Sequence, residues 1–204
     1  MQKPCRAVVF DIGNVFVEWD PRFLYKKLIP DAEELEYFLT KVVTLKWHSE
    51  HDRGRPFAEG VKILSAQFPQ YAALIEAFDT RWGETISGLI PGTCEILDAL
   101  VEAGVPVYAL TNFSAEKFPQ FCDEYAFTRQ FKGIVVSGEE RLIKPDPKIF
   151  DVTLSRFNLT PEETLFIDDR LENVQAAEAK GLIGHQFTDA QSLLIGLKAK
   201  DFNL

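Results

Sequence analysis

The sequence predicts an α/β fold, a doubly wound parallel sheet with a block of helices inserted after its first strand. Three observations support this fold class. Short apolar runs recur along the 204-residue chain, amphipathic helical patterns separate most of them, and one long region contains helical patterns alone. The composition, 46% hydrophobic and 26% charged, suits one core with a smaller appended unit.

The predicted strands are apolar runs bounded by turn residues, as expected for strands buried on both faces. They cover residues 7–10, 105–110, 133–136, 164–167 and, more weakly, 182–187. Helices are predicted at 94–103, 147–157 and 171–180, the first and last being followed by Gly104 and Gly181 as helix stops. A short helical start is predicted at 160–163, with Thr160 as its cap.

Residues 16–88 interrupt this alternation, because we find helical patterns there and expect no strand. The patterns cover residues 21–28, 32–45, 56–67 and 71–82, and their aromatic side chains suffice for the core of a helical bundle. A helical block at this position predicts a cap over the carboxyl ends of the sheet, where it would exclude water and select substrates. We therefore expect a core domain of residues 1–15 and 89–204, and a cap domain of residues 16–88.

Charge and cysteine content exclude several classes of protein. A net charge of −9 argues against a general nucleic-acid binder, which needs a basic surface. The cysteines Cys5, Cys94 and Cys122 are too few and too widely spaced for a disulfide framework or a zinc motif. We find no signal peptide and no apolar stretch that would span a bilayer. We expect a cytoplasmic monomer or homodimer without nucleic-acid or membrane partners.

Polar side chains follow four of the predicted strands, at the edge where open α/β sheets bind ligands. Each has an ordinary structural explanation, since Asp, Asn and Thr are common in turns and at helix starts. Together they supply a carboxylate nucleophile, a hydroxyl donor, a cation and metal-binding acids, which is the set that phosphoryl transfer requires. The residues are Asp11, Thr111 with Asn112, Lys144, and Asp168 with Asp169.

Four motifs in this order make the chain resemble the haloacid dehalogenase-like hydrolase superfamily over nearly its whole length. They are FDIGNV, LIPGTCEILDALVEAGVPVYALTN, KPDPKIF and LFIDDRLENVQAAEAKG. The resemblance implies a Rossmann-like core. It is strongest to the branch with a helical cap and an Asp-x-Gly-Asn-Val first motif, which includes sugar-1-phosphate phosphatases. A small phosphorylated metabolite, with sugar phosphates among the candidates, is the implied substrate.

The resemblance also implies a catalytic role for each matching side chain. Asp11 would attack phosphorus and become an aspartyl phosphate. Thr111 and the backbone N–H of Asn112 would hold phosphate oxygens, and Lys144 would neutralise charge between Asp11 and the phosphoryl group.

Mg²⁺ is the implied cofactor, since it prefers oxygen ligands. Its implied ligands are Asp11, the carbonyl of Gly13 and Asp169, with Asp168 as a further candidate. Asn173 would orient Asp169 or a water molecule.

Gly13 departs from the pattern of most phosphatases in the superfamily, which carry a second Asp there as general acid and base. Haloacid dehalogenases also lack that Asp, so a 2-haloacid dehalogenase is one alternative. The retained pair Asp168–Asp169 argues against it, because uncompensated acids beside an anionic substrate are costly. A non-catalytic phosphate- or partner-binding protein is the other alternative. The intact Asp11, Thr111 and Lys144 argue against that one.

The stretch WHSEHDRG, residues 47–54, lies in the predicted cap and has two interpretations. It is a polar turn, or it places His51 and Arg53 in the pocket, where His51 would shuttle a proton and Arg53 would bind a phosphate or a sugar hydroxyl. Similar phosphatases carry a comparable stretch. A zinc site at His48 and His51 lacks a third ligand nearby.

Overall fold

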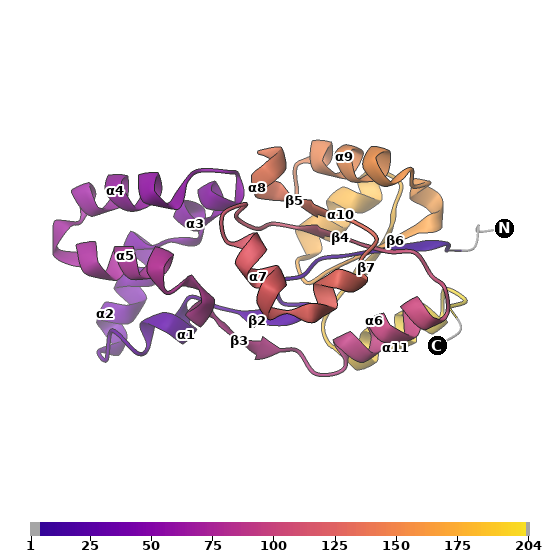
Figure 1. The fold of residues 1–204 in the computed structure, drawn as a ribbon, viewed down its shortest axis with the longest axis horizontal. Coiled ribbons are helices and arrows are strands. Elements are labelled where there is room, and N and C mark those ends of the chain that lie inside the picture. Colours follow the sequence, from indigo (N-terminus) through magenta and orange to yellow (C-terminus); the bar gives the residue numbers. More distant parts are fainter. Residues whose placement is uncertain (1–4, 203–204) are drawn as a thin grey trace.

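The computed structural model describes residues 5–202 and contains a central sheet of five strands in the order β5-β4-β1-β6-β7 (Figure 1). All four strand pairings are parallel, and the first strand lies in the middle of the sheet. The predicted α/β class is therefore confirmed. The strands are β1 (Ala7–Phe10), β4 (Val107–Thr111), β5 (Ile134–Val136), β6 (Thr164–Asp168) and β7 (Ile183–Gln186).

Alternate side chains of the strands enter two separate apolar layers, because successive residues of a strand point to opposite faces. In β1, Val8 and Phe10 belong to one layer and Val9 to the other. Helices α6 (Thr93–Glu102), α7 (Phe118–Glu124) and α11 (Ala190–Lys198) cover the first layer. Helices α9 (Pro147–Phe157) and α10 (Leu171–Ala179) cover the second, above the sheet in Figure 1.

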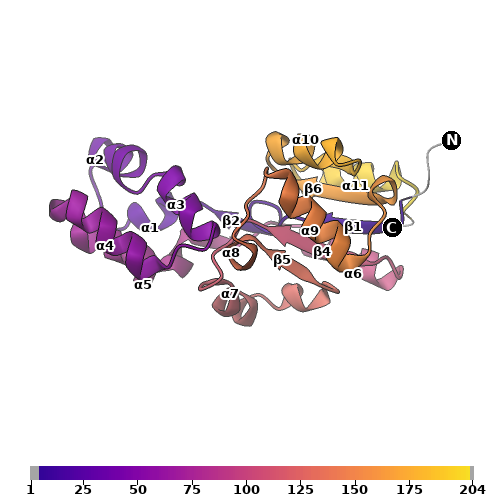
Figure 2. The ribbon, with the colours of Figure 1, turned by 90° about the horizontal axis from the view of Figure 1, so that it is seen from above.

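Five further helices gather beyond one end of the sheet, and we call residues 20–85 the cap (Figure 2). The cap is packed around buried aromatic rings, among them Tyr25, Phe38, Phe57 and Phe78. No helix of residues 5–202 is long and apolar enough to cross a membrane. The helices are α1 (Arg22–Tyr25), α2 (Ala32–Tyr37), α3 (Leu45–Asp52), α4 (Phe57–Gln67) and α5 (Ala72–Thr80).

The expectation that residues 16–88 contain no strand is wrong. Strands β2 (Val17–Trp19) and β3 (Ile86–Leu89) pair in an antiparallel ribbon that joins the cap to the sheet. Each is three or four residues long, and β2 has one buried residue and β3 none, so neither produces the apolar run by which the other strands are recognised.

The helix predicted over residues 32–45 is also wrong at its end. Helix α2 passes into a π-helical turn, Phe38–Val42, and the chain then bends at Val43. Thr44 starts a new helix, because its side chain accepts a hydrogen bond from the backbone N–H of Trp47 at 3.1 Å. The stretch that begins at Trp47 is therefore helical and not a polar turn. The cap predicted at Thr160 is also wrong, because its side chain makes no capping hydrogen bond. Residues Pro161–Glu163 form a 3-10 turn.

Candidate active site

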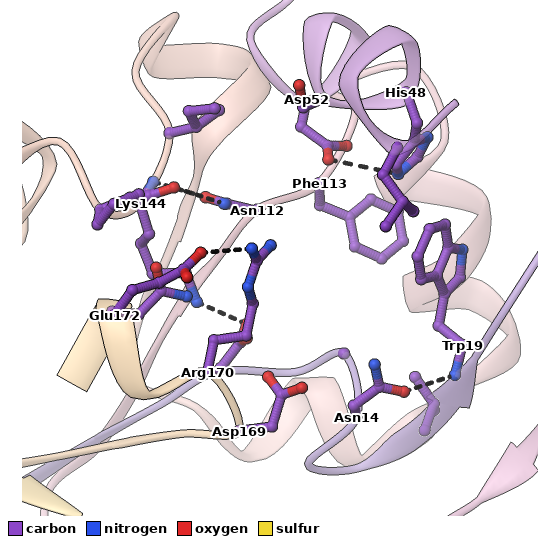
Figure 3. Close-up of a pocket in the computed structure, with 18 of the residues that line it drawn as sticks. Asn14, Trp19, His48, Asp52, Asn112, Phe113, Lys144, Asp169, Arg170 and Glu172 are labelled. Carbon is purple, nitrogen blue, oxygen red and sulfur yellow. Dashed lines mark hydrogen bonds and ion pairs between the residues drawn. The ribbon is translucent and has the colours of Figure 1, made fainter. Parts of the chain in front are cut away.

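A pocket of about 520 Å³ lies between the carboxyl edge of the sheet and the cap (Figure 3). Its core wall comes from the loops that follow β1, β4 and β6 and from the segment before α9. Its cap wall comes from one face of α3 and from the β2–β3 ribbon. The core wall includes Asp11, Gly13, Asn112, Lys144 and Asp169, and the cap wall includes Val17, Trp19, Leu45, His48, Ser49, Asp52 and Ile86.

Lys144 is the centre of the core wall. Its buried ammonium group lies 2.8 Å from Asp11 Oδ1 and 2.7 Å from Asp168 Oδ2, and it donates to the carbonyl of Leu110 at 2.9 Å. Three acceptors match the three hydrogens of an ammonium group, so the side chain is fixed in place. Burial opposes its charge, but the two carboxylates outweigh burial and raise the pKa of Lys144.

Asp11 is 7% exposed, and its Oδ1 also accepts a hydrogen bond from the backbone N–H of Ile12 at 2.7 Å. Burial raises the pKa of Asp11, Asp168 and Asp169 raise it further, and Lys144 opposes them. Three carboxylates therefore share one buried cation. Further positive charge at this edge would favour the ionised form that a nucleophile needs.

The carboxylates of Asp11, Asp168 and Asp169 each place an oxygen within 4.8 Å of the others. Asp168 is fully buried and already accepts hydrogen bonds from Lys144, from Asn173 Nδ2 and from the backbone N–H of Arg170. Asn173 does not bind Asp169 as expected, because its Nδ2 donates to both oxygens of Asp168, at 2.9 and 3.0 Å; its role towards a water molecule stays a prediction. We infer that Asp168 positions Lys144.

The carboxylates of Asp11 and Asp169 line the pocket together with Gly13, where they could hold a metal ion. Burial raises the pKa of Asp169, and the charge of Asp168 raises it further. An all-oxygen donor set of this kind, with excess negative charge, fits Mg²⁺.

Asn112 braces the segment that carries Lys144. Its Nδ2 donates to the carbonyl of Lys144 at 3.0 Å, and its Oδ1 accepts from the backbone N–H of Lys144 at 2.8 Å. Thr111 ends β4 and is 1% exposed, and it is not among the residues that line the pocket. The phosphate-binding roles of both residues remain predictions.

Gly13 is not required by the local backbone. A Cβ atom added there would meet nothing within 4 Å, and the residue has no positive φ. The loop therefore has room for a side chain that the sequence does not supply.

The face of α3 towards the pocket consists of Leu45, His48, Ser49 and Asp52. Their spacing of three and four residues is that of one helical face. His51 lies on another face, fully buried, where its Nδ1–H donates to the carbonyl of Arg55 at 3.0 Å and its ring stacks on Phe57.

The expectation that His51 and Arg53 face the pocket therefore fails in this structure. The helical twist turns His51 towards α4, and Arg53 is exposed beyond the end of α3, outside the lining.

His48 and Asp52 take the positions that were expected for His51 and Arg53, and Figure 3 shows them side by side on α3. His48 Nε2 lies 3.3 Å from Asp52 Oδ2, and the imidazole stacks on Trp19 with ring centroids 4.7 Å apart. Burial lowers the pKa of His48 to about 4. Burial raises the pKa of Asp52 to about 7, opposed by the charge of Lys144. Sequence reasoning missed this pair, although a helical interpretation of residues 45–52 would have placed both on one face.

The rest of the lining is largely apolar and includes the rings of Trp19, Trp82 and Phe113 with the side chains of Ile86 and Leu45. Leu45 is 65% exposed although it is a large apolar residue. At the rim, Arg170 forms an ion pair with Glu172. We call the apolar surface formed by Trp19, Trp82, Phe113, Ile86 and Leu45 the upper wall. The pocket therefore combines charged groups at the edge of the sheet with this apolar surface, a combination that suits an anion attached to an organic group.

Comparisons with known proteins agree with this architecture. A sesquiterpene phosphatase of Aspergillus oryzae, astK, is 29% identical over 196 residues, which cover 95% of this chain and 95% of that protein. A phosphoglycolate phosphatase of Salmonella typhi is 26% identical and covers 86% of this chain and 78% of its own.

Two solved structures share the fold. One is a HAD family enzyme from Bacteroides thetaiotaomicron in complex with magnesium and inorganic phosphate, with a TM-score of 0.72 at 21% identity, covering 91% of this chain and 95% of that one. The other is an L-2-haloacid dehalogenase from Xanthobacter autotrophicus, with a TM-score of 0.64 at 17% identity, covering 96% and 83%. A family model described as haloacid dehalogenase-like hydrolase matches residues 5–181, and the chain belongs to this family of hydrolases.

Proposed function

We propose that the protein is a Mg²⁺-dependent phosphatase that hydrolyses a small phosphate monoester through an aspartyl phosphate on Asp11. The observation that carries this proposal is the ion-paired cluster at the carboxyl edge of the sheet, where Lys144 lies 2.8 Å from Asp11 Oδ1. That contact leaves Asp11 Oδ2 as the attacking atom and puts a fixed cation beside the phosphoryl group. The phosphatase names of the relatives support the same reaction.

The charged and polar residues at the carboxyl edge of the sheet would divide the reaction among them. Asp11 forms a bond to phosphorus, and Lys144 compensates the charge on the phosphoryl oxygens. Thr111 and the backbone N–H of Asn112 bind phosphate oxygens. Asp11, Asp169 and the carbonyl of Gly13 would hold Mg²⁺, which would supply charge neutralisation for the anionic substrate.

A 2-haloacid dehalogenase is less well supported. Three carboxylates with oxygens within 4.8 Å of one another share one buried cation, and without a metal ion this site would repel a haloacid anion. A non-catalytic binding protein has no use for a nucleophile held on a fixed ammonium group. The cluster therefore favours phosphate ester hydrolysis over both alternatives.

The apolar upper wall favours one class of phosphate ester. Trp19, Trp82 and Phe113 offer aromatic surface where a sugar would present hydroxyl groups. We propose an ester whose organic group is apolar or aromatic, and sugar phosphates are the rival class. A comparison of kcat/KM for aryl and isoprenoid monophosphates with that for sugar phosphates separates the two.

The experiment that tests the proposed function measures phosphate release from p-nitrophenyl phosphate by the purified protein with Mg²⁺ and with EDTA. We expect activity with Mg²⁺, loss of activity in EDTA, and a fall in kcat on the order of 10⁴-fold or more for Asp11→Asn. Asp11→Asn should remain folded by circular dichroism. Halide release from a 2-haloalkanoate in EDTA would establish the dehalogenase instead. If the purified protein hydrolysed no phosphate ester, it would instead be a non-catalytic binding protein.

A further inference from the structure

A leaving alkoxide needs a proton, and Gly13, Lys144 and Asp168 of the core do not supply one. Gly13 has no side chain. The three hydrogens of Lys144 are taken by Asp11, Asp168 and the carbonyl of Leu110. Asp168 accepts hydrogen bonds on both oxygens. The cap wall, in contrast, presents a carboxyl group to the pocket, that of Asp52.

We propose that Asp52, held by His48, is the general acid that protonates the leaving oxygen of the substrate. The inference rests on the proposed phosphatase function and assigns a catalytic residue to it. Nothing in the sequence motifs of the core indicates this residue, because it lies on a helix of the cap.

The position of Asp52 suits this role. In an in-line displacement the leaving group departs on the side of phosphorus opposite the nucleophile. Asp11 attacks from the edge of the sheet, so the leaving oxygen faces the cap. Asp52 lines the pocket from α3, and Figure 3 shows it across the pocket from Asp169.

The end of α3 is fixed to the core, which holds Asp52 at a defined position. Ser137 Oγ donates to the backbone carbonyl of Asp52 at 2.6 Å. Two residues further, a Cβ atom on Gly54 would lie 2.8 Å from the carbonyl oxygen of Gly138, so the two backbones are in close contact. We call the Ser137–Asp52 bond and the Gly54–Gly138 contact the seam. An acid on a cap helix is thereby positioned by the core.

His48 supports the protonated form of Asp52. It packs between Trp19 and Phe78, and its Nε2 lies 3.3 Å from Asp52 Oδ2, so a neutral imidazole with its hydrogen on Nε2 would face this oxygen. The acidic hydrogen of Asp52 then lies on Oδ1, free for the substrate. Burial raises the pKa of Asp52 to about 7, so a large fraction carries this hydrogen at neutral pH.

Charged groups around Asp52 are few. Lys144 from the core wall is the cation whose field lowers its pKa. His51, which packs towards α4, is neutral, since burial lowers its pKa to about 4. On α8 (Ser137–Glu140), Glu139 is exposed and Glu140 is paired with Arg156.

Asp52 would act as an acid in the first step and as a base in the second. As the bond from Asp11 Oδ2 to phosphorus forms and the P–O bond to the organic group breaks, the hydrogen of Asp52 passes to the leaving oxygen and gives an alcohol. Asp52 is then a carboxylate. It takes a proton from the water that attacks phosphorus, the P–O bond to Asp11 breaks, phosphate leaves, and Asp52 is protonated again.

The test is the dependence of single-turnover rates on leaving-group basicity for wild type, Asp52→Asn, Asp52→Glu, His48→Gln and, as control, Glu59→Gln on the exposed face of α4. Substrates are p-nitrophenyl phosphate, with a weakly basic leaving group, phenyl phosphate and an alkyl phosphate. Asp52→Asn should lose about 10²-fold or more with the alkyl ester and only a few-fold with p-nitrophenyl phosphate. Asp52→Glu should recover part of the lost rate with the alkyl ester. His48→Gln should narrow the pH range over which that single-turnover rate is high.

The outcomes separate this inference from the proposed function. Hydrolysis of no ester by wild type defeats the function itself. An equal loss with every leaving group, in a variant with an unchanged unfolding temperature or a lowered one, makes Asp52 structural and overturns the inference. The same steep dependence in wild type and in Asp52→Asn overturns it too, because no protein acid then operates.

Discussion

Both walls of the pocket contain buried polar groups, but they compensate the cost of burying these groups in opposite ways. The core wall keeps its charges and pairs them, as Lys144 does with Asp11 and Asp168. The cap wall favours the neutral forms of its titratable groups, since burial lowers the pKa of His48 to about 4 and raises that of Asp52 to about 7. Fixed charge serves to bind and polarise an anion, whereas a neutral acid near its pKa serves to exchange a proton.

The largest effect on this contrast should come from Lys144→Ala, which removes the cation of the core wall. We expect kcat to fall about 10²–10³-fold, because a fixed charge at the phosphoryl group is lost. We also expect the free energy of unfolding to fall by about 3–5 kcal/mol, because two buried carboxylates lose their partner. Steady-state kinetics and denaturant unfolding measure both.

The matched control is Lys180→Ala, since Lys180 forms an exposed ion pair with Asp151 on α9. Its free energy of unfolding should change by less than ~1 kcal/mol. Normal specific activity in Lys144→Ala would contradict the role of the core wall in charge neutralisation.

A second prediction moves the acid from one wall to the other. Gly13→Asp should fold with an unfolding temperature near that of wild type, because the added Cβ meets nothing within 4 Å. Introduced into Asp52→Asn, it should raise the rate with an alkyl phosphate by about 10-fold or more. Gly13→Asn in the same background is the control and should give no rescue. A folded double variant without rescue would show that position 13 does not reach the leaving oxygen.

A third prediction concerns the seam. Gly54 has φ of +97° and its added Cβ would lie 2.8 Å from a carbonyl oxygen, so Gly54→Ala should lower the free energy of unfolding by about 1–3 kcal/mol. Rates with an alkyl phosphate should fall more than those with p-nitrophenyl phosphate. Gly83→Ala, where a Cβ meets nothing within 4 Å, is the control and should do neither. An equal change in both variants would refute a special role for the seam.

A fourth prediction concerns stability alone, which should depend on pH. The pKa of Asp52 is raised from 3.8 to about 7, so the folded state binds more protons than the unfolded state between these values. This contribution to stability is present at low pH and is lost as pH rises through that window. His48, lowered from 6.5 to about 4, acts in the opposite direction.

The difference in unfolding free energy between Asp52→Asn and wild type cancels the histidine contribution. It should rise in favour of the variant from pH 4 to pH 7, with a slope of up to ~1 kcal/mol per pH unit. Urea unfolding at several pH values measures it, with Glu59→Gln as the control. A flat difference would mean that Asp52 keeps its ordinary pKa.

The core could be predicted from the sequence because its strands are continuous apolar runs and its polar residues follow them directly. The edge of the sheet then gathers Asp11 and Asp169, whereas Lys144 comes from the segment between α8 and α9, which Asn112 holds in place. The cap was harder, because its signals are short. Thr44 starts a new helix where one continuous helix was expected, and this boundary decides which histidine lines the pocket. Because residues 45–52 form a helix and not a turn, His48 lines the pocket and His51 does not.

The seam also has a consequence for how the enzyme cycles. A substrate reaches the pocket between the cap and the sheet, and any movement that widens this entrance at the end of α3 would have to separate Gly54 from Gly138 and break the Ser137–Asp52 hydrogen bond. Such a movement withdraws the proton donor from the nucleophile. The protein would therefore admit substrate in one state and cleave it in another. A molecule whose cap has only partly opened would bind an ester without hydrolysing it.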